Sequence, residues 1–190
     1  MPDPVRIAFL DRDGVINQYL PGEYVRTPDE LIILPGVVDA ILALNNAGWR
    51  VAMVTNQQGI GKGLMTSAEL DSVHAKLLDA LEQAGAMLDS VRICPHLASD
   101  ACACRKPKPG MILDIANELH GDLPASVFFG DTDSDAAAAR AAGVGAFHLI
   151  LGGKRTEDHA QDTKYFPTPP DGIYPNLVSA VTAVLQSSSK

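Results

Sequence analysis

Asp11 and Asp13 stand two positions apart, directly after the apolar run 5–10. Such a run is typical of a short buried strand, so both acids fall where the strand ends. Gly14 permits a sharp turn just behind them. Two carboxylates held together in this way are costly unless a cation joins them. The pair therefore indicates a site for a hard metal such as Mg²⁺, with one aspartate free to act as a nucleophile.

Three further groups of polar residues accompany this pair, and two of them follow the same pattern. Thr55 and Asn56 come after the apolar run 51–54, Lys106 lies in a basic segment, and Asp131 follows the run 127–129. Each has a plain structural explanation when taken singly, such as a solvated loop for the lysine, or acids favoured at a helix N-terminus for Asp131 and Asp135. Their shared place near the ends of predicted elements favours a common functional site.

All three cysteines of the chain fall within one short segment together with a histidine. The set is Cys94, His96, Cys102 and Cys104. Three sulfurs and one nitrogen match a closed tetrahedral zinc site, whereas the alternative is a group of incidental thiols. An odd cysteine count argues against a disulfide framework. We therefore expect a structural Zn²⁺ that stiffens the loop 94–104 just before Lys106.

Composition limits the classes of partner. The chain has 190 residues, of which 46% are hydrophobic, enough for one domain spanning 1–190 with a well-filled core. Its net charge of −8 argues against nucleic acids and anionic membranes as partners. No apolar run resembles a signal peptide or a membrane span, so we expect a cytoplasmic protein. We also expect a monomer.

Predicted strands alternate with predicted helices along the chain. We expect strands at 5–10, 51–54, 91–93, 127–129 and 146–151, and helices at 35–44, 109–119, 136–142 and 177–185. A further helix should follow Thr66, which forms a capping box with Glu69. This alternation predicts an α/β fold, a Rossmann-like parallel sheet with helices on both faces. Ligands bind such sheets outside the carboxyl ends of the strands.

The chain leaves no room for a large cap domain over that edge. We expect an open site, rimmed by a flap at 18–31 and by the loop 94–104, while 171–175 should be a loop. Arg105 is a candidate for a distal hydroxyl or second phosphate, because its guanidinium is a forked donor. Tyr24, Arg26 and Lys62 are weaker candidates, better explained as solvated. The remaining histidines, His74 among them, have no partner in the sequence and are expected at the surface or in the core.

The order of these motifs resembles that of the haloacid dehalogenase-like phosphatases, over about residues 5–151. The segment from Asp11 to Val15 is similar to the family's first motif, Thr55 with Asn56 to its second, Lys106 to its third, and Asp131 with Asp135 to its fourth. The resemblance implies that Asp11 forms an aspartyl-phosphate and that Asp13 is the general acid and base. It also implies that Mg²⁺ is held by the Asp11 carboxylate, the Asp13 backbone carbonyl and Asp131.

The same resemblance implies roles for the remaining residues. Thr55, Asn56 and Lys106 would hold the phosphoryl oxygens, and Asp135 would support the metal site. The zinc loop resembles a branch of the family that acts on heptose bisphosphates or on histidinol phosphate. The motif sequences favour heptose 1,7-bisphosphate, a sugar phosphate, and the short spacer between His96 and Cys102 favours histidinol phosphate. A non-catalytic, zinc-stabilised binding module is the alternative from another class.

Overall fold

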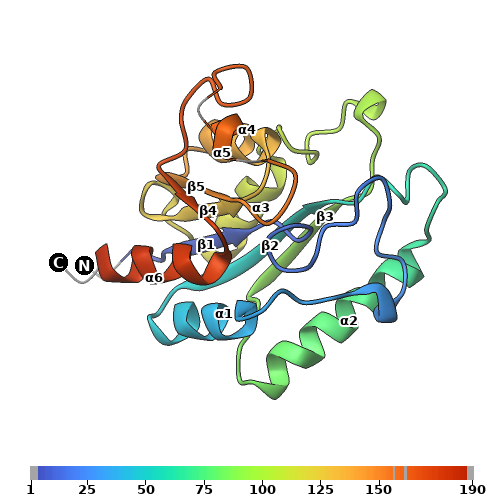
Figure 1. The fold of residues 1–190 in the computed structure, drawn as a ribbon, viewed down its shortest axis with the longest axis horizontal. Coiled ribbons are helices and arrows are strands. Elements are labelled where there is room, and N and C mark those ends of the chain that lie inside the picture. The colour runs from blue at the N-terminus through green and yellow to red at the C-terminus, as the bar shows by residue number, and fades with distance from the viewer. Residues whose placement is uncertain (1–3, 156, 161, 188–190) are drawn as a thin grey trace.

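Six parallel strands form one central sheet in the computed structural model, which describes residues 4–155, 157–160 and 162–187 (Figure 1). The strands are β1 (Ile7–Leu10), β2 (Arg50–Asn56), β3 (Ser90–Cys94), β4 (Val127–Gly130), β5 (Ala146–Ile150) and β6 (Gly172–Tyr174). They lie side by side in the order β3-β2-β1-β4-β5-β6, and every neighbouring pair is parallel. The predicted Rossmann-like parallel sheet is therefore confirmed.

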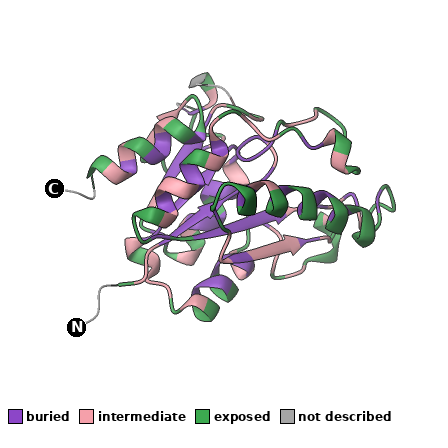
Figure 2. Ribbon diagram, turned by 90° about the horizontal axis from the view of Figure 1, so that it is seen from below, coloured by how far each residue is buried: buried purple, intermediate pink, exposed green. Residues whose placement is uncertain are grey.

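Helices cover both faces of this sheet (Figure 1). They are α1 (Val37–Asn46), α2 (Ser67–Gln83), α3 (Gly110–Leu119), α4 (Asp133–Ala142), α5 (Glu157–Ala160) and α6 (Leu177–Ser187). The apolar sides of α1, α2 and α6 pack in one hydrophobic cluster, and those of α3 and α4 pack in a second cluster across the sheet. Figure 2 shows the buried strands lying between these helical layers.

Strand β1 joins both clusters because its side chains alternate between the two faces. Ala8 and Leu10 belong to one cluster, Ile7 and Phe9 belong to the other, and all four are fully buried. Full burial of a side chain the size of leucine contributes about 1.5–3 kcal/mol. The core thus fixes the strand that leads directly to Asp11.

Helix α2 begins where the sequence predicted. The hydroxyl of Thr66 accepts a hydrogen bond from the Glu69 backbone N–H at 3.1 Å, and the Glu69 carboxylate accepts one from the Thr66 N–H at 2.6 Å. The capping box is confirmed. Leu77 and Leu81 anchor the helix in the core, and His74 is buried on the same side.

The expectation of a loop at 171–175 is wrong. Three of these residues form β6, which pairs with β5 from His148 opposite Gly172 to Ile150 opposite Tyr174. The backbone N–H of Asp171 donates to the Phe147 carbonyl at 2.8 Å, which continues the pairing. Without β6, the edge of the sheet at β5 would leave backbone N–H and C=O groups unpaired. Pairing with these groups is what makes so short a segment a strand.

The flap at 18–31 contains a single 3-10 turn, Pro28–Glu30, and several of its residues face the site described below. None of the helices in the described part of the chain is both long enough and apolar enough to cross a membrane.

Candidate active site

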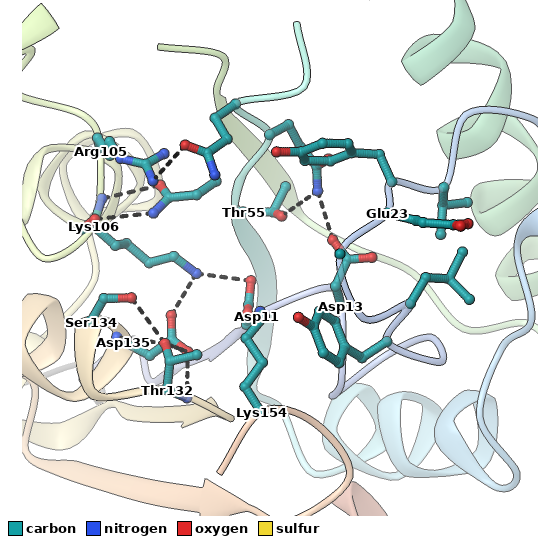
Figure 3. Close-up of a pocket in the computed structure, with 18 of the residues that line it drawn as sticks. Asp11, Asp13, Glu23, Thr55, Arg105, Lys106, Thr132, Ser134, Asp135 and Lys154 are labelled. Carbon is teal, nitrogen blue, oxygen red and sulfur yellow. Dashed lines mark hydrogen bonds and ion pairs between the residues drawn. The ribbon is translucent and has the colours of Figure 1, made fainter. Parts of the chain in front are cut away.

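Polar residues meet at the carboxyl ends of three adjacent strands. Asp11 follows β1, Thr55 and Asn56 end β2, and Asp131 follows β4. The strand order changes direction between β1 and β4, which is where parallel sheets of this kind bind ligands. A cavity of about 400 Å³ opens there (Figure 3). The six expected catalytic and substrate-binding residues all line it: Asp11, Asp13, Thr55, Asn56, Arg105 and Lys106.

Lys106 is buried on the floor of this cavity, with only 4% of its surface exposed. Its Nζ donates to Asp11 Oδ1 at 2.8 Å and to the Val54 carbonyl at 2.9 Å, and it pairs with Asp135 Oδ1 at 2.6 Å. The ammonium group is therefore held by two hydrogen bonds and one ion pair. Burial opposes the charge, yet the Asp11 and Asp135 carboxylates raise the pKa of Lys106 above its ordinary value.

Asp131 has the features of a metal ligand. The residue is fully buried, and its Oδ2 accepts a hydrogen bond from the Lys154 backbone N–H at 2.9 Å. Its Oδ1 has no hydrogen-bond partner among the described residues. Burial and then the Asp11 carboxylate raise the pKa of Asp131 well above its usual value. A buried carboxylate oxygen in this state fits a cation, and oxygen donors suit Mg²⁺.

Asp11, Asp131 and Asp135 each place a carboxylate oxygen within 4.8 Å of the others. Asp135 has its oxygens engaged already, because Oδ2 accepts from the Thr132 N–H at 3.0 Å and Oδ1 pairs with Lys106. Asp11 and Asp131 are left as the carboxylates that fit an added ion. Asp135 instead orients the start of α4 and holds Lys106.

Two glycines enclose the Asp131 carboxylate. A Cβ atom added to Gly14 would lie 2.6 Å from Asp131 Oδ2, and one added to Gly153 would collide with the same oxygen. Gly14 also has a φ of +99°, in the left-handed region that favours glycine. Any larger residue at either position would displace the carboxylate.

The Asp13 side chain makes contacts of a different kind. Arg12 Nη2 donates to both of its oxygens at 3.0 Å, Asn17 Nδ2 donates to Oδ1 at 3.0 Å, and Gln57 Nε2 donates to Oδ2 at 2.8 Å. Burial would raise the pKa of Asp13, but Arg12 and the donated hydrogen bonds hold it below its usual value. Asp13 is therefore an anion at neutral pH, held in place by three side chains.

Gln57 is a site residue that the sequence analysis missed. Its Nε2 bridges Asp13 Oδ2 and Thr55 Oγ1, the latter at 2.9 Å. Thr55 is thereby linked to the expected acid and base. Asn56 lines the cavity too, but its amide bonds to the backbone of Lys106.

Lys154 was also missed, because it lies beyond the last recognisable motif. Its Nζ is 3.8 Å from Asp131 Oδ2 and 4.7 Å from the centroid of the Tyr19 ring, and it lines the cavity (Figure 3). Burial opposes its charge, but Asp131 and Asp11 raise the pKa of Lys154. The signal in the sequence is the pair Gly152 and Gly153, which allows the backbone a close approach.

The four expected zinc ligands lie together beside the cavity. Cys104 Sγ is 3.3 Å from Cys94 Sγ and 3.4 Å from Cys102 Sγ, while His96 Nδ1 is 3.3 Å from Cys104 Sγ. The Cys94 and Cys102 sulfurs are 3.7 Å apart, and all three cysteines are free. Thiolates about 2.3 Å from a tetrahedral zinc would be about 3.8 Å apart, so the donor set fits that ion.

Arg105 connects this cysteine cluster to the rim of the cavity. Its Nη1 donates to the His96 carbonyl and its Nη2 donates to Gln58 Oε1, both at 3.3 Å. Tyr24 and Lys62 also line the cavity, with Lys62 Nζ 5.8 Å from the Tyr24 ring centroid. Arg26 is not among the lining residues.

Sequence comparison identifies the family. The model of the haloacid dehalogenase-like hydrolases matches residues 5–143, so the chain belongs to this family. A D-glycero-beta-D-manno-heptose-1,7-bisphosphate 7-phosphatase of Bordetella bronchiseptica is 42% identical over 151 residues, which cover 80% of this chain and 84% of that protein. A D-glycero-alpha-D-manno-heptose-1,7-bisphosphate 7-phosphatase of Mycobacterium tuberculosis is 40% identical over 160 residues, covering 83% and 84% of the two chains.

Structural comparison agrees. The crystal structure of the B. bronchiseptica D,D-heptose 1,7-bisphosphate phosphatase, complexed with magnesium and phosphate, superposes with a TM-score of 0.87 at 38% identity. The match covers 96% of this chain and 99% of that one. The resemblance to a phosphatase family that the motif order predicted is thereby confirmed.

Proposed function

We propose that this chain is a Mg²⁺-dependent phosphatase that removes the 7-phosphate of D-glycero-D-manno-heptose 1,7-bisphosphate. The observation that carries the proposal is the grouping of Asp11, Asp131 and Lys106 at the switch point of the sheet, where Asp131 Oδ1 has no hydrogen-bond partner among the described residues. The choice of substrate rests on the two relatives at 40–42% identity, because both are named for this reaction.

The proposed reaction has two steps, both on Asp11. Asp13 is an anion in the free site, so it must first take up a proton when the anionic substrate binds. A carboxylate oxygen of Asp11 then attacks phosphorus, the ester P–O bond breaks, and Asp13 gives that proton to the departing alkoxide. Asp13 then takes a proton from water, whose oxygen attacks phosphorus and releases inorganic phosphate from Asp11. Asp11, the Asp13 backbone carbonyl and Asp131 would hold Mg²⁺, which supplies positive charge against the phosphate dianion.

Cations of the protein complete the charge balance. Lys106 touches Asp11 at 2.8 Å, and Lys154 lies beside Asp131 at 3.8 Å. Both can offset the repulsion between the phosphate and the buried carboxylates. We assign Thr55 to phosphoryl contact through its hydroxyl, and Asn56 to holding Lys106 in place.

We also propose a structural Zn²⁺ held by the four residues of the cysteine cluster: Cys94, His96, Cys102 and Cys104. Four protein ligands leave no open position, so the ion would stabilise the loop without chemistry of its own. The loop leads within two residues to Lys106, so its order would fix the position of that lysine.

The charges around the cavity support a substrate with a second phosphate. Apart from Asp11, Asp13, Lys106 and Asp135, the charged residues that line it are three cations and one acid: Lys62, Arg105, Lys154 and Glu23. Histidinol phosphate carries a cationic amine and would instead favour an acidic rim. This alternative rests on the short spacer between His96 and Cys102, and direct competition between the two substrates separates them.

The test is phosphate release with Mg²⁺ from both anomers of heptose 1,7-bisphosphate, beside histidinol phosphate. We expect a higher kcat/KM for a heptose bisphosphate, loss of activity with EDTA, and loss of turnover in a folded Asp11→Asn variant. Preference for histidinol phosphate would replace the proposed substrate and leave the proposed mechanism unchanged. Activity that survives in Asp11→Asn would refute the nucleophile.

We further propose a cytoplasmic monomer. Cytoplasmic thiols stay reduced, as a cluster of three free cysteines requires. Light scattering after size-exclusion chromatography checks the oligomeric state.

A further inference from the structure

We infer that His74 on α2 is a positioning residue for Asp13, and that it acts through the buried guanidinium of Arg12. The inference rests on the proposed function, because it concerns how the acid and base of that reaction is held. Helix α2 places none of its residues in the cavity lining. Any contribution of α2 to the chemistry would therefore pass through the contact between His74 and Arg12.

Arg12 is fully buried, although it lies between two residues of the active site. One side of its guanidinium donates hydrogen bonds to Asp13, with Nη2 at 3.0 Å from both carboxylate oxygens and Nε at 3.3 Å from Oδ1. The other end reaches α2, where Nη1 lies 3.1 Å from His74 Nε2. The flat cation therefore joins Asp13 to a helix 62 positions along the chain.

The direction of this hydrogen bond determines the state of the histidine. A guanidinium group has donors and no acceptor, so Nη1 must donate and Nε2 of His74 must carry a lone pair. His74 is therefore neutral with its proton on Nδ1. Burial, followed by the charge of Arg12, lowers the pKa of His74 to about 4, in agreement with this assignment.

The helix is a firm support for such a contact. Val73 and Leu77, on either side of His74, are buried in the core. If the acceptor at His74 were lost, a buried N–H of a charged group would have no partner, which is costly. The guanidinium would then turn toward another acceptor, and its planar fork on Asp13 would be distorted.

Two amide variants separate positioning from packing. The amide group of Gln can occupy the place of the histidine Nε2, whereas that of Asn is one methylene shorter and does not reach Arg12. We compare His74→Gln with His74→Asn, and use Leu77→Ala as a control that loosens the same helix without touching Arg12.

The readout is the dependence on the leaving group. A sugar phosphate releases an alkoxide that needs a proton from Asp13, whereas p-nitrophenyl phosphate releases a stable phenolate that needs none. The parameter is kcat/KM, which covers the steps up to release of the alcohol. We expect His74→Asn to lower it about tenfold for the sugar phosphate, part of the roughly 10²- to 10⁴-fold effect of a positioned acid.

The same variant should change kcat/KM for p-nitrophenyl phosphate much less, and His74→Gln should stay close to the wild type with both substrates. An equal loss with both substrates in His74→Asn, or the same pattern in Leu77→Ala, would overturn the inference. A wild-type enzyme that releases phosphate from neither substrate would instead reject the proposed function.

Discussion

The side chain of Asn56 bonds to both backbone groups of Lys106. Asn56 Nδ2 donates to the Lys106 carbonyl at 3.0 Å, and Asn56 Oδ1 accepts from the Lys106 N–H at 3.1 Å. A residue at the end of β2 thereby fixes a residue of the loop that follows the cysteine cluster. The two residues are 50 positions apart in the chain.

We expect Asn56→Ala to lower kcat by about tenfold or more, because the Lys106 ammonium must lie within hydrogen-bond distance of Asp11 to act. Asn56→Asp keeps the acceptor and removes the donor, so its activity should fall between those of Asn56→Ala and the wild type. Steady-state kinetics on the sugar phosphate test this order. Unchanged kcat in Asn56→Ala would show that the loop holds Lys106 without help.

Lys154→Met should weaken the binding of phosphate while leaving the metal site intact. The backbone N–H that bonds to Asp131 remains in this variant, and only the cation beside the carboxylates is lost. A hydrogen bond to a charged group is worth about 1.5–3 kcal/mol, so the inhibition constant of inorganic phosphate should rise about tenfold or more.

The Mg²⁺ concentration for half-maximal activity of Lys154→Met should stay the same or fall, since a neighbouring positive charge is removed. Lys164→Met is the matched control, because Lys164 stacks on Tyr165 and does not line the cavity. A rise in the Mg²⁺ requirement would mean that Lys154 serves the metal site and not the phosphate.

Cys102→Ser should lose bound zinc, and its kcat should fall together with its Tm. Metal binding contributes directly to the folding of such loops, and Lys106 lies two residues beyond the last ligand. Metal analysis and kinetics on the same preparation test the link. Ser99→Ala, an exposed change in the same loop, is the control. A zinc-free Cys102→Ser enzyme with full activity would reject the structural role of the ion.

The pKa of His74 predicts an acid-sensitive stability. In the folded protein it is about 4, below the 6.5 of an ordinary histidine, so the unfolded chain binds the proton first. The contribution of His74 is complete above pH 6.5 and is lost as the pH falls toward 4. A difference of this size corresponds to about 3 kcal/mol.

Urea unfolding of wild type and His74→Gln at neutral pH and near pH 4.5 isolates this effect, because glutamine does not titrate. The free energy of unfolding should fall by about 2–3 kcal/mol more in the wild type than in the variant. Equal losses in both proteins would place the acid sensitivity in other groups, such as Asp13, whose lowered pKa acts in the same direction.

Local signals predicted much of the fold and part of the site. The apolar run before Asp11 predicted β1, and the spacing of Thr66 and Glu69 predicted the start of α2, because both depend on residues close in sequence. β6 was missed because Gly172–Tyr174 has no periodic pattern and owes its form to pairing with β5. The assignment of Asp11, Asp13 and Lys106 to catalysis, and of Asp131 to the metal site, remains a prediction.

The missed site residues have a common physical origin. Lys154 meets Asp131 across 23 positions, His74 meets Arg12 across 62, and Gln57 meets Asp13 across 44. Such contacts exist only after the sheet has assembled, so no local pattern marks them. His74 was expected as a surface or core residue. It is indeed buried, and its contact with Arg12 has no trace in the sequence.

The enclosure of Asp131 by Gly14 and Gly153 would tie the proposed metal binding to the completion of folding. Three segments must converge there: the turn after β1, the end of β4 and the loop after β5. A partly folded chain would leave Asp131 in water with no second carboxylate beside it. An ion that binds only the native state stabilises it, by about 2.7 kcal/mol at a hundred times its Kd. Binding of the ion would thus stabilise only the completely folded state. Mg²⁺ depletion in a cell would then shorten the lifetime of this protein as well as slow its chemistry.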